Sequence, residues 1–126
     1  MDMNAADRSL KAKLFRGLAD PSRLAVLEAL RDGPRCVSEV VAATGLSQPN
    51  ASAHLACLGE CGLVSRERRG KFVYYGIADK RVVKILEEAE GILGEVGAHI
   101  YRCTRYEPRA PGRRRRARGQ AERGTR

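Results

Sequence analysis

The chain has little of the chemistry that enzymes use. It contains two His, and it has no paired carboxylates in a Gly-rich loop and no nucleophile motif, so we predict neither an enzyme nor a small-molecule substrate. It also lacks a signal peptide and an apolar run of about 18 residues. We therefore expect a cytoplasmic protein with no membrane partner. In that reducing compartment the four Cys are expected to be thiols or metal ligands rather than disulfides.

Acidic residues are in the minority, and the imbalance is uneven along the chain. Lys and Arg number 24 against 15 Asp and Glu, a net charge of +9. Residues 107–126 hold eight Arg against two Glu, a net of +6, which leaves +3 for residues 1–106. Since no amphipathic or spanning segment accompanies this charge, we expect nucleic acid rather than a membrane as partner. We predict one domain over residues 1–106 and a disordered Arg-rich tail over residues 107–126.

The first half of the chain has the pattern of consecutive short helices. Apolar residues at helical spacing predict helices over residues 7–18, 22–31 and 37–44. Asp20 as N-cap and Pro21 at the first helical position start the second of these helices. A tight turn then leads into a fourth helix, and this is the spacing of a helix-turn-helix.

Residues 47–62 predict the fourth helix, which carries both candidate DNA contacts and two cysteines. Ser47 is a good N-cap with Pro49 in the first turn, and Gly62 is placed to end the helix in a left-handed conformation. Its apolar stripe consists of Ala51, His54, Leu55 and Leu58. This stripe predicts packing on a small core and leaves the remaining surface free for other contacts.

After Gly62 the apolar period changes from helical to alternating. Residues 63–68 and 72–77 predict two strands around a basic tip, the wing of a winged helix. Short polar groups at the start of the fourth helix can bind base edges or phosphates, and the basic wing suits phosphates or a minor groove. The candidate contacts to double-stranded DNA are Ser47, Gln48, Asn50, Ser52, His54, Arg66, Arg68, Arg69 and Lys71. A solvated hairpin with ordinary surface charge is the alternative for the wing.

A long helix is expected from residue 80 to about residue 101. Its apolar positions repeat at three- and four-residue steps from Val82 to Ile100, and the first helix is too short to bury them all. We infer a two-fold homodimer through the N-terminal and long C-terminal helices, as operator half-sites one turn of DNA apart require. The predicted fold class is mostly α with a small β-hairpin, a winged helix-turn-helix.

Three strings, taken in order, carry a family resemblance. They are Leu-Ala-Asp-Pro-Ser-Arg-Leu at residues 18–24, Leu-Ser-Gln-Pro-Asn-Ala-Ser-Ala-His-Leu at residues 46–55, and Gly-Leu-Val at residues 62–64 before the wing string Arg-Gly-Lys-Phe-Val-Tyr-Tyr at residues 69–75. Together they resemble the ArsR/SmtB family of metal-sensing winged-helix repressors. The resemblance implies a homodimer that occupies operator DNA when metal-free and leaves it when metal binds.

Two of that family's metal sites do not match this chain. The arsenic- and cadmium-type Cys-Val-Cys pair corresponds to residues 36–38, where Cys36 is the one thiol. The zinc-type Asp-x-His start corresponds to residues 79–81, and His99 is the one His of the long helix. We therefore expect Cys36 to be a core residue or a bystander.

A third type of site does match. The string at residues 54–64 is similar to the cadmium/lead sensor branch, the CmtR type, which implies a thiolate site formed by Cys57, Cys61 and Cys103. Side chains four residues apart on a helix are neighbours, so Cys57 and Cys61 can chelate one ion. An all-sulfur site selects a soft effector, Cd(II), Pb(II) or Hg(II). His54 is expected to pack or to contact the DNA backbone rather than to bind metal.

Two other functions stay open. Cys57 and Cys61 could oxidise in a thiol-based redox-sensing winged-helix repressor without a physiological metal, although parallel side chains on a helix are a poor disulfide frame. A purely architectural DNA binder would use the basic tail and show no metal response.

Overall fold

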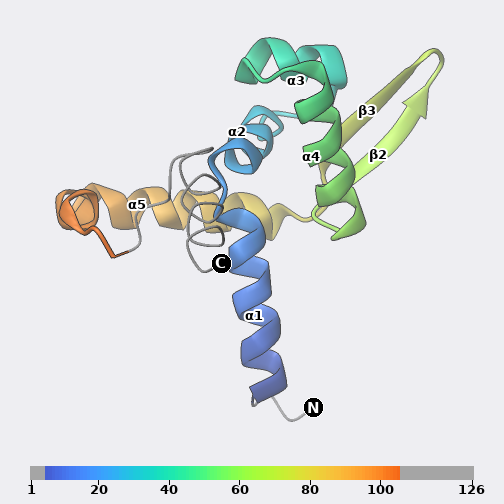
Figure 1. Cartoon of the computed structure of the whole chain (residues 1–126). Coiled ribbons are helices and arrows are strands. Elements are labelled where there is room, and N and C mark those ends of the chain that lie inside the picture. Colours follow the sequence, from blue (N-terminus) through green and yellow to red (C-terminus); the bar gives the residue numbers. More distant parts are fainter. Residues whose placement is uncertain (1–4, 106–126) are drawn as a thin grey trace, which may run out of the picture. The chain divides into compact units, whose positions relative to one another are not determined.

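The structure is a computed structural model that describes residues 5–105. The chain divides into two units, Met1–Glu87 and Glu88–Arg126. In chain order the elements are α1 (Ala5–Leu18), α2 (Pro21–Ala29), β1 (Arg35–Cys36), α3 (Val37–Thr44), α4 (Gln48–Glu60), β2 (Val64–Arg69), β3 (Phe72–Ile77) and α5 (Lys80–Arg102) (Figure 1). The predicted tail at residues 107–126 lies outside the described residues, and its boundary stays a prediction.

The corner between α1 and α2 is built by local hydrogen bonds. The Asp20 carboxylate accepts from the Arg23 backbone N–H at 2.9 Å, so Asp20 is the predicted N-cap of α2. The Arg23 side chain reaches back, and its Nε donates to the Gly17 carbonyl at 2.6 Å. These bonds satisfy backbone groups that the end of one helix and the start of the next leave open.

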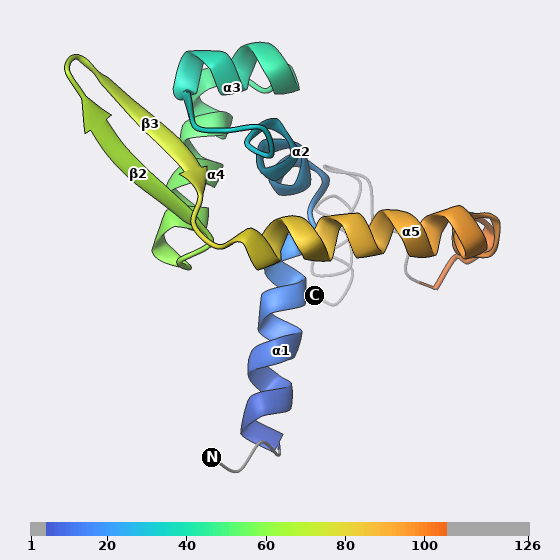
Figure 2. The ribbon, with the colours of Figure 1, turned by 180° about the vertical axis from the view of Figure 1, so that it is seen from behind.

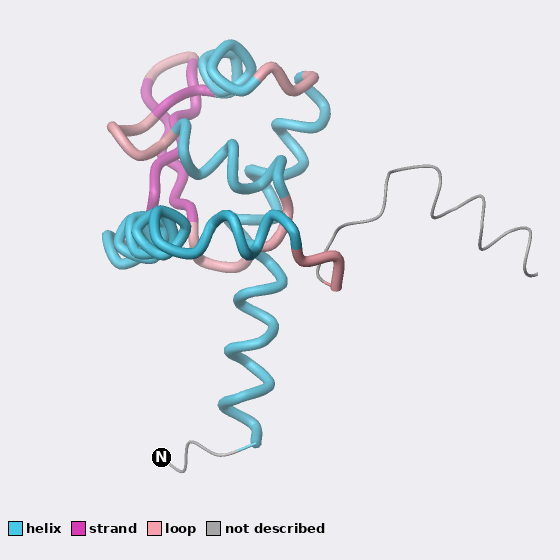
Figure 3. The backbone as a smooth tube through the Cα atoms, turned by 90° about the vertical axis from the view of Figure 1, so that its left-hand side faces the viewer, coloured by secondary structure: helices cyan, strands magenta, loops and turns pink. Residues whose placement is uncertain are grey.

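Only the C-terminal end of helix α1, next to this corner, packs against the other described residues of the first unit. The helix projects away from α2, α3 and α4 in all three views (Figures 1 to 3). Leu18 at its end is buried, whereas Leu10, Leu14 and Phe15 are 65%, 37% and 56% exposed. Among the described residues of the first unit, most of the apolar side of α1 is therefore left uncovered.

The predicted hairpin is confirmed, and the structure adds a strand that the sequence did not predict. Strands β2 and β3 pair antiparallel from Val64 opposite Ile77 to Arg69 opposite Phe72, with a tight turn in which Gly70 has a φ of 62°. Strand β1 pairs with the other edge of β3, giving the order β1-β3-β2. Because β1 has two residues, it has no alternating pattern that could predict it.

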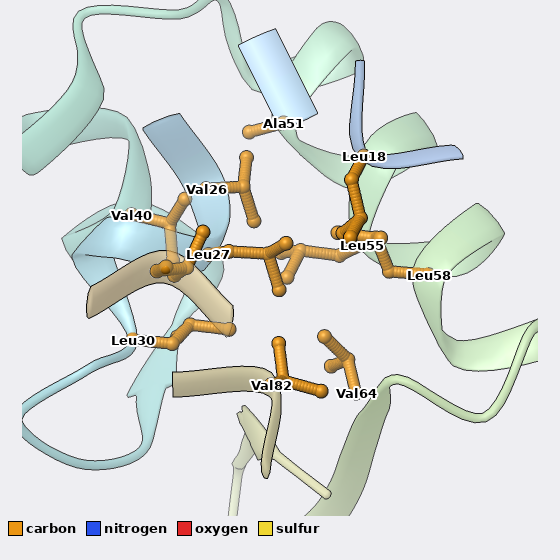
Figure 4. Close-up of a cluster of buried hydrophobic side chains, with 11 residues drawn as sticks. Leu18, Val26, Leu27, Leu30, Val40, Ala51, Leu55, Leu58, Val64 and Val82 are labelled. Atoms are coloured by element: carbon orange, nitrogen blue, oxygen red, sulfur yellow. The ribbon is translucent and has the colours of Figure 1, made fainter. Parts of the chain in front are cut away.

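The core of the first unit collects apolar side chains from every helix and from β2 (Figure 4). Its buried members are Leu18, Val26, Leu27, Leu30, Val40, Ala51, Leu55, Leu58, Val64, Val82 and Leu86. Three residues of the predicted α4 stripe are among them, whereas the fourth, His54, is only half-buried. On α2 and its C-cap, Val26, Leu27 and Leu30 are buried, and the half-buried Leu24 packs against the same core.

Helix α5 passes from the first unit into the second. Its first turns bury Val82 and Leu86. In the second unit the apolar side chains Ile92, Leu93, Val96 and Ile100 are 56%, 50%, 38% and 48% exposed. No helix among residues 5–105 is long and apolar enough to span a membrane.

Candidate functional site

A short turn fixes α4 against α3. Helix α3 ends at Gly45, whose φ is 77° and whose N–H donates to the Val41 carbonyl at 2.8 Å. The Thr44 hydroxyl donates to the Val40 carbonyl at 2.7 Å and accepts from the Leu46 N–H at 3.2 Å. The connection is therefore held on both sides, and the start of α4 has a defined direction.

The start of α4 presents the predicted polar groups to solvent. The Ser47 hydroxyl accepts from the Asn50 N–H at 3.2 Å, which confirms Ser47 as the N-cap. Gln48, Asn50 and Ser52 are exposed, whereas Ala51 is fully buried. Burial of Ala51 anchors this turn on the core, so its polar side chains are available to a partner while the backbone is held in place.

The end of α4 carries two free and exposed thiols, Cys57 and Cys61. Cys61 is the C-cap, and its N–H donates to the Cys57 carbonyl at 3.1 Å. Gly62 follows with a φ of 80°, the predicted left-handed end of the helix. The two thiols therefore lie one turn apart on a hydrogen-bonded helix end.

The other two cysteines are in different surroundings. Cys36 is buried, as expected for a core residue, and its Sγ lies 3.2 Å from the Ser38 hydroxyl. Cys103 belongs to the second unit, where it is half-buried and its N–H donates to the His99 carbonyl at 3.1 Å. Within the described part of either unit, no three His, Cys, Asp or Glu side chains gather closely enough to hold a metal ion.

The wing lies beside α4 and is strongly basic (Figures 1 and 2). Arg66, Arg68, Arg69 and Lys71 are all exposed, as predicted. Arg68 is drawn into the turn, because its Nε donates to the Gly70 carbonyl at 3.3 Å. The wing therefore presents its basic groups to solvent, with Arg68 partly oriented by the backbone.

The wing also contains a cluster of three side chains that the sequence analysis did not predict. Arg69 pairs with the Glu67 carboxylate at 3.0 Å, and its guanidinium carbon lies 5.1 Å from the centre of the Tyr74 ring. We call these three residues the Arg69 cluster. The alternation of a strand places residues 67 and 69 on one face, so this part of the contact was available from the sequence. The participation of Tyr74 depends on the register.

One charge pair marks the start of α5. Hydrogen bonds from the Arg81 side chain and backbone N–H hold the pKa of the Asp79 carboxyl down to about 2. The same pairing raises the pKa of Arg81. Asp79 therefore caps α5 as a carboxylate.

Comparisons with known proteins agree with this architecture. A model of the family "Bacterial regulatory protein, arsR family" matches residues 20–66. The chain is 42% identical over 94 residues to a probable mercury resistance operon repressor of Streptomyces lividans, covering 75% of each protein. It is 42% identical over 80 residues to the HTH-type transcriptional regulator CmtR of Mycobacterium tuberculosis, covering 64% of this chain and 68% of that protein.

A solved structure extends the similarity to nearly the whole described chain. It is the solution structure of a homodimeric winged helix-turn-helix DNA-binding domain from Mycobacterium bovis, a possible ArsR-family transcriptional regulator. The TM-score is 0.67 at 31% identity, and the match covers 85% of this chain and 96% of that one. The predicted winged helix-turn-helix fold is therefore confirmed.

Proposed function

Because the chain belongs to the ArsR family of bacterial regulatory proteins, we propose that it is a metal-responsive transcriptional repressor, which occupies operator DNA when metal-free and leaves it on binding a soft heavy-metal ion. The family is one of DNA-binding transcriptional regulators, so the prediction that the chain is not an enzyme is confirmed. The metal, its ligands, the operator contacts and the dimer remain parts of the proposal.

The observation that carries this proposal is the pair of exposed thiols on α4. Cys57 and Cys61 lie one turn apart on the helix whose opposite end exposes Gln48 and Asn50. Two thiolates at this spacing fit a soft ion such as Cd(II), Pb(II) or Hg(II) far better than Mg(II) or Ca(II). One relative is named a mercury resistance operon repressor, which supports including Hg(II) among the candidates.

Cys103 is the proposed third ligand. With it, one ion would be held by both α4 and the C-terminal region, so binding would restrain the helix that reads DNA. Allosteric coupling of this kind is typically ~1–3 kcal/mol, which weakens operator binding ~5–150-fold. Thiols must lose their protons to bind a metal, so affinity should rise with pH.

We propose that a second copy of the chain packs against the exposed apolar surfaces of α1 and α5. In the first unit, the exposed side of α1 adjoins an apolar hollow of about 320 Å³, whose lining includes Leu14, Leu18 and Leu63. In the second unit, α5 exposes the apolar side chains named above. Exposed apolar patches of this kind mark association surfaces. The homodimeric relative supports this reading.

The proposed operator contacts are the exposed polar start of α4 and the basic wing. They are Ser47, Gln48, Asn50, Ser52, His54, Arg66, Arg68, Arg69 and Lys71, of which His54 is half-buried and the others are exposed. A dimer would place two such sets on half-sites one helical turn apart. The phosphate contacts should make affinity fall steeply as salt rises.

Metal titration of the reduced dimer tests the proposal. Cd(II), Pb(II), Hg(II) and Zn(II) are added while thiolate-to-metal ultraviolet bands and operator release are followed together. Cys57→Ser and Cys61→Ser should each abolish tight soft-metal binding, whereas Cys103→Ser should leave a weaker complex and reduce operator release. Cys36→Ser is the matched control for loss of a thiol. If Cys36→Ser silences the response while Cys103→Ser is normal, the proposed site is wrong.

A thiol redox sensor is the second candidate, favoured by the exposure of the same two thiols. Its test is the count of free thiols and the operator affinity after mild oxidation without metal. The bond from the Cys61 N–H to the Cys57 carbonyl keeps these residues helical, and a disulfide there requires distortion. Release of the operator on oxidation of Cys57 and Cys61, with no response to any soft metal, would favour this candidate.

A further inference from the structure

The Arg69 cluster commits one basic side chain of the wing to contacts within the protein. Arg69 Nη2 and Nε both donate to the same Glu67 carboxylate oxygen, at 3.0 and 3.2 Å. The guanidinium carbon lies 5.1 Å from the centre of the Tyr74 ring. Arg69 therefore has an acidic partner on one edge and an aromatic partner on one face.

The strand register explains how the cluster forms. Glu67 lies directly opposite Tyr74, whereas Arg69 lies opposite Phe72, next to the turn. Side chains two residues apart on a strand share a face, so Glu67 and Arg69 project to the same side. To reach both partners, the Arg69 side chain must bend back along the hairpin, away from the tip.

Arg66 provides the contrast within the same strand. It projects to the opposite face, lies opposite Tyr75, and lines the groove between the wing and α4. Within the part of the chain that the structure describes, Arg66 has no acidic partner. Arg66 and Arg69 are thus two exposed arginines on one strand that differ in whether their charge is already paired.

We propose that Glu67 is a positioning residue that holds Arg69 back from DNA, so that the wing of the free protein offers phosphates Arg66, Arg68 and Lys71 but not Arg69. The proposal rests on the proposed DNA-binding function and refines its set of contacts. The consequence is a limit on sequence-independent affinity, because that affinity grows with each phosphate a cation neutralises. A regulator with fewer such contacts spends less time on non-operator DNA.

The contacts of the Arg69 cluster orient the Arg69 side chain without being needed for folding. The Glu67 and Arg69 side chains are 68% and 54% exposed, and exposed ion pairs contribute little to folding stability. Glu67→Gln should therefore leave the fold intact. A cation over an aromatic ring adds a modest attraction that keeps the bent conformation populated.

The test is the salt dependence of binding to a non-operator duplex by the full-length dimer. Loss of one phosphate contact per wing changes the slope of log K against log salt by ~0.9, or ~1.8 per dimer. Arg66→Gln should flatten the slope by about this amount, and Arg69→Gln by less than half of it. Glu67→Gln should steepen the slope by up to ~1.8, worth roughly 12-fold in the ratio of affinities at 50 and 200 mM salt.

Two controls separate release of Arg69 from simple loss of a negative charge. Glu28→Gln removes an exposed carboxylate from α2, away from the wing residues, and should leave the slope close to that of the parent. The double variant Glu67→Gln/Arg69→Gln should lose the gain seen in Glu67→Gln. The proposal is wrong if Arg69→Gln flattens the slope by half as much as Arg66→Gln or more, or if the gain persists without Arg69.

A measurement without DNA keeps this inference distinct from the proposed function. The Arg69 Nε–H signal in nitrogen-15 NMR of the free protein should be protected from exchange in the parent and exposed in Glu67→Gln. If the parent binds no DNA, the proposed function fails and the NMR signal alone decides whether Glu67 holds Arg69. An unprotected signal in the parent overturns the proposal.

Discussion

Removal of Phe15 should weaken the proposed dimer without unfolding the chain. The Phe15 side chain is 56% exposed on α1, so about half of its burial energy is still available. Complete burial of a large apolar side chain is worth roughly 1.5–3 kcal/mol, and half of that is about 0.8–1.5 kcal/mol. A two-fold interface contains the residue twice. Phe15→Ala should therefore cost the dimer roughly 1.6–3 kcal/mol, about 15- to 150-fold in its dissociation constant.

Sedimentation equilibrium over a range of protein concentrations measures this change. Lys13→Ala is the matched control, because it shortens an exposed side chain of the same helix outside its apolar side. The helix content of Phe15→Ala should equal that of the parent when both are fully dimeric. If Phe15→Ala leaves the dissociation constant unchanged, α1 does not contribute to the interface and the reasoning from its exposed face fails.

Three further outcomes are expected from the described residues. Leu55→Ala, at a fully buried position, should lower the free energy of unfolding by about 2–5 kcal/mol in denaturant titrations. Gly59→Ala should stabilise the chain by up to about 1 kcal/mol, because an added Cβ meets only the Val64 carbonyl at 3.7 Å. Gly62→Ala should destabilise it by about 1–2 kcal/mol, because Gly62 has a φ of 80° that alanine adopts at a cost. The stabilisation from Asp79 should be fully present above its ordinary pKa of 3.8 and disappear as pH falls through about 2. The free energy of unfolding of Asp79→Asn, measured over the same acid range, should lack this pH-dependent contribution. Identical pH profiles of the parent and Asp79→Asn would contradict the prediction.

The helical part of the fold could be predicted because its boundaries are marked by local chemistry. Asp20 and Ser47 cap helices with their own side chains, and Gly45 and Gly62 end helices in the left-handed region. These signals act over three or four residues, so a single sequence contains them. The pairing of β1 with β3 depends on the packing of the whole unit and has no such local signal.

The candidate site likewise has features that the local sequence predicts and features that depend on distant contacts. Exposure of Gln48, Cys57 and Cys61 followed from the helical period once Leu55 was assigned to the core. Contacts across strands or between distant segments could not be predicted in this way. Tyr74 joins the Arg69 cluster through the strand register, and the role of Cys103 depends on tertiary and quaternary placement that spacing along the chain does not define.

The position of the thiols along α4 limits how they could influence DNA. From Gln48 to Cys61 the helix rises about 20 Å, so an ion held by Cys57 and Cys61 would not touch bases at the proposed DNA contacts of the opposite end. Its influence would have to pass through the helix and its buried anchors, Leu55 and Leu58. Gly59 lies between the two thiols, and the space around it admits a Cβ, so packing does not require glycine there. Glycine leaves this last turn easier to distort than alanine would. Drawing both thiols onto one ion would therefore stiffen this last turn of α4, and packing through Leu55 and Leu58 would carry the change to the proposed DNA contacts at the other end.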